Sequence, residues 1–194
     1  MRKIVVAVAA LAFLAPSSAH ALGFVGVRAG YALPSGNAQE GQPMKDSVTS
    51  AIPIQVDAGL SMLNILSFGV YGGYGPLQFK SDYKDRVCTS CSGQVLRAGL
   101  QLNVRPPLVL KELWGGVFGG YERLSSKGGA VDVKASGWEG GLQAGWDFSI
   151  LPLLSVGPFA SYSVGKFTSL SGGTLGTQAQ HQTLTLGLRG LFEL

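Results

Sequence analysis

Residues 137–148 (GWEGGLQAGWDF) alternate apolar and polar side chains and constrain the fold more than any other stretch of the chain. One face carries Trp138, Leu142, Trp146 and Phe148 between small residues, whereas the other carries only polar residues and glycine. The two tryptophans bracket the apolar face. At roughly 3.3 Å per residue and a tilt near 45°, their spacing projects to about 19 Å along a bilayer normal, close to the apolar band of a membrane strand. The pattern therefore predicts a strand with one side against lipid.

The first 21 residues have the organisation of a secretory signal peptide. Two basic residues precede the apolar run 4–15, and the triplet Ala-His-Ala at 19–21 provides a small-x-small cleavage site. The apolar run ends at Pro16 and is too short for a spanning helix, which argues against a membrane anchor. We expect cleavage after Ala21, which leaves residues 22–194 as an exported chain.

The exported part is long enough for one domain and contains all 29 glycines. It has no run of the ~20 apolar residues that a spanning helix needs. Two options remain, a periplasmic β-protein or a closed barrel in the outer membrane, since closure leaves no unpaired edge in lipid. Loss of the two basic residues of the leader lowers the formal net charge from +4 to +2, so we expect no nucleic-acid partner.

Alternating segments recur along the whole exported chain. Each is ten to twelve residues long, and their number is even, as in single-chain bacterial barrels. We therefore predict an all-β fold, an eight-stranded antiparallel up-and-down transmembrane β-barrel. The segments are residues 23–33, 52–62, 67–77, 94–104, 113–123, 137–148, 154–165 and 183–194, and the facing of the glycine-rich third one is ambiguous.

The connections between these segments alternate in length. Short periplasmic turns and longer extracellular loops would produce this rhythm, with both termini on the periplasmic side. A soluble lipocalin-like barrel has the same number of strands but does not explain the alternation. The short links are 63–66, 105–112 and 149–153, the long polar ones are 34–50, 78–93 and 166–182, and the link 124–132 is intermediate.

Charged residues on the inward faces of the predicted strands include two groups of three. One set lies near mid-height and the other nearer the outer mouth, and each set contains both signs, as charges kept from bulk water require. The interior of an eight-stranded barrel is narrow enough for side chains to fill, so we favour an ion-paired plug over a gate or a solute path. The first set is Arg28, Asp57 and Arg189, and the second is Arg97, Glu122 and Glu139.

Outward-facing aromatic residues predict a girdle at each membrane interface. Such rings flank the apolar band of outer-membrane barrels. We expect the girdle to contain Tyr31, Tyr121, Trp138, Trp146, Phe148, Tyr162 and Phe192.

The two cysteines, Cys88 and Cys91, form a C-x-x-C motif in the second long link. The export route is oxidising, which favours a local disulfide in an outer loop. A redox pair lacks the βαβ context of such motifs, and a zinc site lacks ligands because His181 lies far along the chain. We expect no metal and no cofactor.

The chain resembles the small outer-membrane β-barrel families of the OmpA-barrel, OmpX and OmpW type. The resemblance rests on residues 114–122 (WGGVFGGYE), on the strand 137–148 and on Gly-Pro-Phe at 157–159, and it covers the exported chain. It implies a monomer surrounded by outer-membrane lipids. The last strand resembles the signal that such proteins present to the barrel-assembly machinery, although it ends on Leu194 where an aromatic residue is usual.

Some barrels of this size modify lipid A, so we looked for the corresponding catalytic motif. The deacylase pattern His-x-Ser-Asn is absent, because His181 is followed by Gln182 and Thr183. A pair formed across strands with Ser161 or Ser163 stays open as an alternative. A solvated loop histidine is far commoner than a general base, so we predict no catalytic residues and no enzyme.

Two functional classes follow from the resemblance. The first is a porin-like but closed barrel that anchors surface loops for structural or interaction roles. The second is a narrow OmpW-like channel that passes small hydrophobic molecules sideways into the membrane. We favour the first class, because the predicted luminal ion pairs and the lack of an apolar luminal lining argue against transport.

Overall fold

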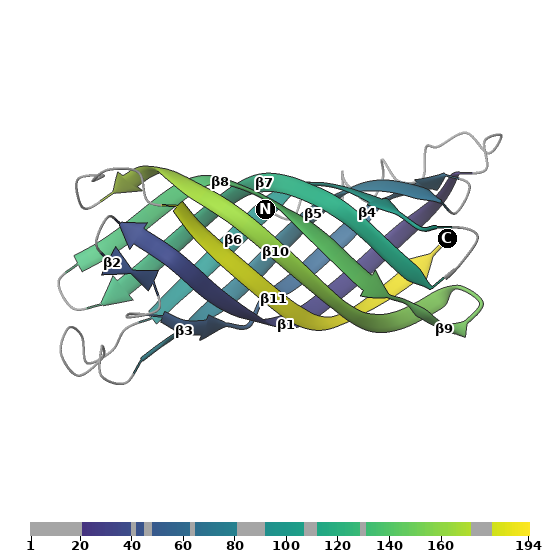
Figure 1. Ribbon diagram of the computed structural model, residues 1–194, viewed down its shortest axis with the longest axis horizontal. Helices are drawn as coiled ribbons and strands as arrows, with labels where there is room; N and C mark the ends of the chain where they lie inside the picture. Colours follow the sequence, from purple (N-terminus) through teal and green to yellow (C-terminus); the bar gives the residue numbers. More distant parts are fainter. Residues whose placement is uncertain are drawn as a thin grey trace, which may run out of the picture.

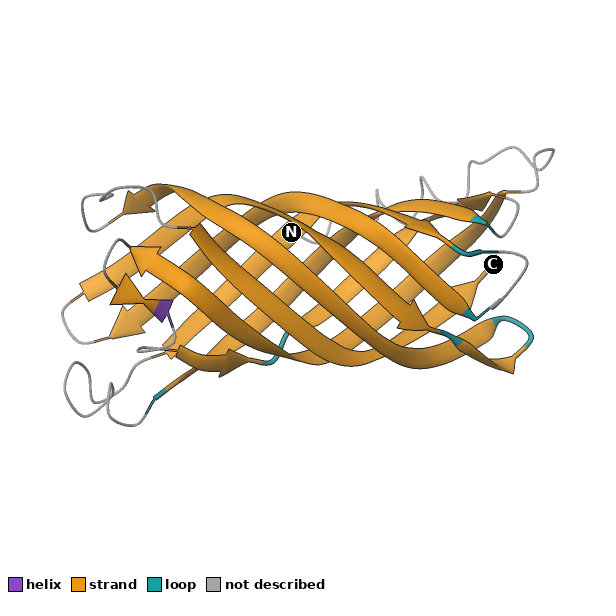
Figure 2. Ribbon diagram, viewed as in Figure 1, coloured by secondary structure: helices purple, strands orange, loops and turns teal. Residues whose placement is uncertain are grey.

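The computed structural model of the protein describes residues 21–39, 42–44, 48–62, 65–80, 92–106, 112–128, 131–171 and 180–194. Long tilted strands wrap around a common axis and make up nearly all of these ranges (Figures 1 and 2). Within these ranges, no helix is both long and apolar enough to cross a membrane. The expected leader, up to residue 20, and the expected disulfide between Cys88 and Cys91 lie outside the described residues.

The strands form a closed antiparallel ring of eight, which confirms the predicted fold class. Strands β3 and β4 occupy one place in the ring, because both pair with β1 on one side and with β5 on the other. The short strands β2 (Gln42–Pro43) and β9 (Phe148–Leu151) extend the pairing at the rims, next to β1 and β10. The members of the ring are β1 (Ala21–Gln39), β3 (Val48–Ala51) with β4 (Ile54–Met62), β5 (Leu66–Phe79), β6 (Ser92–Val104), β7 (Leu113–Gly128), β8 (Val131–Trp146), β10 (Leu154–Ser171) and β11 (Gln180–Glu193).

The first and last strands close the ring. Strand β1 pairs with β11 in one unbroken register, from Phe24 opposite Glu193 to Gly36 opposite His181. Every member of the ring therefore has a neighbour on both sides, and the backbone donors and acceptors of the wall bond within the wall.

The barrel is apolar outside and polar inside. Leu100 on the outer face of β6 is 68% exposed, whereas Asp57 on the inner face of β4 is 1% exposed. In the ambiguous glycine-rich segment, Tyr71 is buried inside and Val70 is exposed. This distribution is the reverse of a soluble domain, in which large apolar side chains gather in the core.

Strands run further than expected at the end of the barrel opposite the C-terminus (Figure 1). The prediction of a link over 124–132 was wrong, because β7 continues to Gly128 and β8 begins at Val131. Strands β10 and β11 likewise enter the expected link 166–182. The extended ends of these strands are rich in polar residues, but the hydrogen-bond ladder continues through them.

At the other end, the expected strand 137–148 is divided. Strand β8 ends at Trp146, and Phe148 begins β9, which pairs with β10. Asp147 separates the two strands, and its backbone N–H donates to the carbonyl oxygen of Glu112 (N···O 2.8 Å). The alternation continues across the break, so the Asp147 side chain points into the barrel, where it is buried.

Candidate functional site

A buried ion-paired cluster occupies the middle of the barrel. The Nε atom of Arg28 lies 3.1 Å from Oδ1 of Asp57, and Nη2 of Arg189 lies 4.0 Å from Oδ2 of the same carboxylate. The three residues come from the neighbouring strands β1, β4 and β11. Both guanidinium groups also lie over the Trp114 ring, at 5.3 Å and 4.4 Å from its centroid. The structure thus brings together the first set of charges expected from the sequence.

Arg28 reaches across the lumen to the opposite wall. Its Nη1 donates to Oε1 of Gln143 on β8 (2.6 Å), and its Nη2 donates to Oε1 of Gln101 on β6 (2.8 Å). Gln143 in turn donates from Nε2 to Oδ1 of Asn103 (2.6 Å). These bonds connect three walls of the barrel through buried side chains.

A second group of ion pairs lies at the end of the barrel near the C-terminus. Arg105 pairs through Nη1 with Oε1 of Glu193 (2.8 Å) and through Nη2 with Oδ2 of Asp147 (2.9 Å). Arg189 joins them from within, with Nη1 3.3 Å from the same Asp147 oxygen. Burial lowers the pKa of Arg105, but the hydrogen bonds and charges of Glu193 and Asp147 outweigh it and hold this pKa above its usual range.

Sequence reasoning missed the role of Arg105 because the residue was assigned to a turn. A signal was nevertheless present. The inward positions of β6 are odd-numbered and include Arg97, Gln101 and Asn103, so the same alternation places residue 105 inward as well. The strand alternation can thus continue for one residue beyond the end of the strand.

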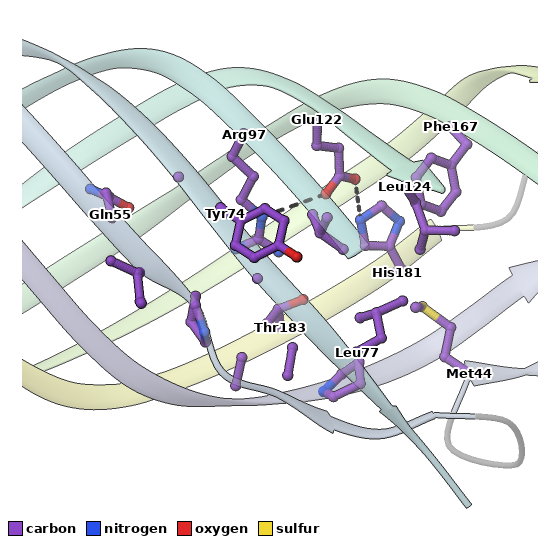
Figure 3. Close-up of a pocket in the computed structure, with 18 residues that line it drawn as sticks. Met44, Gln55, Tyr74, Leu77, Arg97, Glu122, Leu124, Phe167, His181 and Thr183 are labelled. Atoms are coloured by element: carbon purple, nitrogen blue, oxygen red, sulfur yellow. Dashed lines mark ion pairs between the residues drawn. The ribbon is translucent and has the colours of Figure 1, made fainter. Parts of the chain in front are cut away.

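The second expected set of charges lies at the other end of the lumen, and Figure 3 shows two of its members, Arg97 and Glu122. Nε of Arg97 is 3.4 Å from Oε2 of Glu139 and 3.8 Å from Oε2 of Glu122. Tyr71 donates its hydroxyl to Oε1 of Glu139 (3.4 Å), and Nε2 of His181 faces Oε1 of Glu122. We call these five residues the mouth cluster.

The expectation of a solvated loop histidine at 181 was wrong. His181 lies in β11, is 3% exposed and stacks on Phe167 with ring centroids 4.4 Å apart. Strand β11 begins at Gln180, three residues before the expected start, and the inward alternation therefore includes residue 181. A polar stretch before the predicted strand gave no sign of this extension.

A cavity lies above the mouth cluster, and we call it the mouth cavity (Figure 3). The space not filled by atoms is about 620 Å³, including the part that is open to solvent. Its floor contains Arg97, Glu122, His181 and Thr183. Its walls are mostly apolar and include Met44, Leu77, Val95, Leu124 and Phe167.

The expected girdle residues all face outward, and some of them contact one another. Tyr121 and Trp138 meet edge to face with centroids 5.6 Å apart, and Trp146 stacks on Phe148 at 6.3 Å. The two contacts lie eight residues apart along β8 and its continuation. The rings of Tyr31, Tyr162 and Phe192 are exposed on the outer face without belonging to either contact.

Comparison with known proteins identifies the fold. No protein-family model matches the chain, and no curated protein matches its sequence. The crystal structure of Neisserial surface protein A (NspA) matches 86% of this chain and 95% of its own, at 16% identity and a TM-score of 0.55. The outer membrane protein OprG from Pseudomonas aeruginosa matches 91% of this chain and 98% of its own, at 11% identity and a TM-score of 0.55. The chain therefore has the fold of the small outer-membrane β-barrel proteins, as its resemblance to the OmpA, OmpX and OmpW types predicts.

Proposed function

We propose that the protein is a non-enzymatic outer-membrane barrel with a closed lumen, which anchors surface loops for structural or interaction roles. The observation that carries this proposal is the set of side-chain bonds from Arg28 to Gln143 and Gln101, which crosses the lumen between opposite walls. Below it, Arg105 joins Asp147 and Glu193 in a second layer. An eight-stranded barrel is narrow enough for two such layers to fill it.

The outer surface supports a position in the membrane. Leu100, Leu142 and Leu188 are among the most exposed residues of the barrel and lie on different strands, which in water would favour aggregation. We propose that lipids of the outer membrane cover this surface, with the short turns and both termini on the periplasmic side. Insertion by the barrel-assembly machinery, a monomeric state, the cleaved leader and the Cys88–Cys91 disulfide belong to the same proposal.

The absence of enzymatic activity is proposed from the state of the inward polar groups. Glu122 is engaged by both Arg97 and His181, and Glu139 by Arg97 and Tyr71. A carboxylate that acts as a general base must be free to take a proton from a substrate. These partners hold the groups in fixed pairs, which suits a structural role.

Heat-modifiability followed by conductance tests the proposal on one preparation. The detergent-purified protein should migrate differently on a gel before and after boiling, and the folded form should give no discrete conductance steps in a planar bilayer. The boiled sample is the control for both measurements. Identical migration would contradict the membrane barrel, and steady unitary steps would contradict the closed lumen.

Substitution in the mouth cluster tests the luminal network. Arg97→Ala leaves the buried carboxylates of Glu122 and Glu139 facing each other, so the free energy of unfolding should fall by about 3 kcal/mol. Glu139→Ala should also destabilise the barrel or open conductance. Urea titration in detergent measures the first effect. If both variants match the parent in stability and conductance, the network has no role in closure.

One observation favours the second candidate, a narrow channel for small hydrophobic molecules. The mouth cavity is lined by the lipid-facing residues Ile54 and Tyr74 as well as by inward residues. Next to Ile54 the ladder is weakened, because Gly30 donates to Pro53 (3.1 Å) and Ile52 to Pro76 (3.2 Å) but neither proline can donate in return. These features would permit a sideways path through the wall.

Replacement of both prolines tests this second candidate. Pro53→Ala combined with Pro76→Ala restores two donors to the ladder and should slow the transfer of naphthalene into proteoliposomes. The parent protein must first accelerate transfer over protein-free vesicles. Equal rates with and without the protein would exclude the channel, whereas a slower double variant would support it over a fully closed barrel.

A further inference from the structure

We propose that the mouth cavity binds one small neutral amphiphile, with its apolar tail against the cavity wall and a hydroxyl head at His181. The inference goes beyond a closed barrel with surface loops, because it gives the outer end a ligand. It requires no conduction, since the cavity lies above the obstructed part of the lumen.

The walls of the mouth cavity define the tail of the ligand. Met44, Leu77, Val95, Leu124 and Phe167 present alkyl, thioether and aromatic groups, and they come from the strands of the barrel or, for Met44, from beside β2. A hollow built on a β-sheet is largely formed before a ligand arrives.

The floor of the mouth cavity carries an unmatched polar group. The His181 side chain is almost wholly buried, and its Nδ1 atom has no hydrogen-bond partner among the described residues. Nε2 faces Oε1 of Glu122, and in the tautomer that places a hydrogen on Nε2 the Nδ1 atom carries a lone pair and acts as an acceptor. The stacked Phe167 ring fixes the orientation of the imidazole. A ligand with an O–H group would satisfy this acceptor.

The charges beneath the cavity favour a neutral head. Two carboxyl groups, those of Glu122 and Glu139, lie beside the single guanidinium group of Arg97, so an anionic head would meet more acidic than basic groups. A cationic head would meet the positive charge of Arg97 first. The Arg97 side chain is 20% exposed, whereas the side chains of its two carboxylate partners are at most 3% exposed. A hydroxyl group donates one hydrogen bond and brings no charge.

Methionine methyl NMR tests binding with a control inside the chain. The exported part contains two methionines, Met44 in the cavity wall and Met62, which is 47% exposed on the outer face at the opposite end of the barrel. In nanodiscs, 1-octanol should shift the Met44 signal to saturation. The Met62 signal should change only in proportion to the alcohol in the lipid. Parallel, non-saturating changes at both residues would mean partitioning into lipid and would overturn the proposal.

A series of probe molecules on the unmodified protein tests the head group. Octyl methyl ether has nearly the same shape as 1-octanol but no donor, and it should bind about fivefold more weakly. Octanoate should bind more weakly than the ether because of the two carboxylates. Equal affinity of alcohol and ether, or tighter binding of octanoate, would contradict the assigned chemistry whatever happens to the variants.

Two substitutions complete the test. Val95→Phe fills the cavity and should abolish the saturable Met44 shift, whereas Val104→Phe on the lipid-facing side of the same strand should leave it unchanged. His181→Phe keeps the stack on Phe167 and should make alcohol and ether equivalent. Heat-modifiability verifies folding of each variant. Saturable binding to the Val95→Phe variant would overturn the ligand proposal. If the parent protein neither conducts nor binds the probe, the ligand proposal fails and the proposal of a closed lumen stands.

Discussion

Asp57 is the most enclosed charge in the described part of the barrel, and its environment shows how the interior tolerates ions. Its carboxylate lies between the guanidinium groups of Arg28 and Arg189, and its side chain has no exposed surface. Asp147 pairs with Arg189 on the other side. A buried charge without a partner is strongly destabilising, so each of these residues depends on the next one.

Asp57→Asn should expose this dependence. The amide keeps the shape of the side chain but leaves Arg28 and Arg189 close together with less compensating charge, so we expect the free energy of unfolding to fall by about 3 kcal/mol. Urea unfolding in detergent, followed by heat-modifiability, measures the loss. Glu112→Gln in the exposed turn before β7 is the matched control and should leave stability unchanged. A loss shared by both variants would mean that the buried pairs are not special.

The period of the strands made part of this network predictable. Alternation alone places Arg28 and Asp57 on inner faces, and sequential pairing makes their strands neighbours. It cannot predict that Arg28 meets Gln143, 115 residues away, because that contact depends on how far the strands tilt when the ring closes. Tyr71 could not be assigned either, since glycines on both faces of β5 conceal the alternation.

At the scale of elements, the close approach of β6 and β7 beside β5 depends on paired glycines. Gly99 and Gly120 face each other across the two strands, and the Tyr71 hydroxyl lies over both. A Cβ atom on Gly120 would lie 2.6 Å from the Tyr71 oxygen and 2.7 Å from Cα of Gly99. The pair makes room for the aromatic ring that reaches Glu139 in the mouth cluster.

Gly120→Ala should therefore destabilise the barrel. The added methyl must displace Tyr71 or spread β6 from β7, and overpacking of this kind costs about 1–3 kcal/mol. Gly72→Ala on the outer face of β5 is the control, because a Cβ there meets no atom within 4 Å. It should be neutral or slightly stabilising, since alanine restricts the unfolded chain. If the two variants unfold at the same urea concentration, the packing argument is contradicted.

The ends of the strands were the least predictable feature at this scale. Polarity changes where the wall leaves the apolar layer, but backbone pairing of β7 with β8 continues through Ser125 and Ser126. The extension brought His181 from a supposed loop into the mouth cluster. If each predicted membrane strand is ended at its first polar residues, the side chains at the rim of the barrel are wrongly assigned to loops.

At the scale of the whole molecule, the described luminal side chains form three layers of contacts. Arg105 with Glu193 and Asp147 forms the layer nearest the C-terminus, Arg28 with its partners forms the middle, and the mouth cluster lies above. The mouth cavity is thus a blind pocket in the described part of the barrel. The two proposed roles, carrying loops and holding a ligand at one end, are compatible with this arrangement.

Truncation of the middle layer should open the lumen more than truncation at the surface. Arg28→Ala combined with Gln143→Ala removes the two side chains that meet across the barrel, while Asp57 keeps Arg189 as a partner, so the fold should survive. We expect small discrete conductance steps in planar bilayers, where the parent gives none. Arg123→Ala combined with Gln180→Ala, two exposed residues near the outer end, should stay silent. A folded but silent Arg28/Gln143 variant would show that the layers above and below suffice for closure, and that the middle layer serves stability alone.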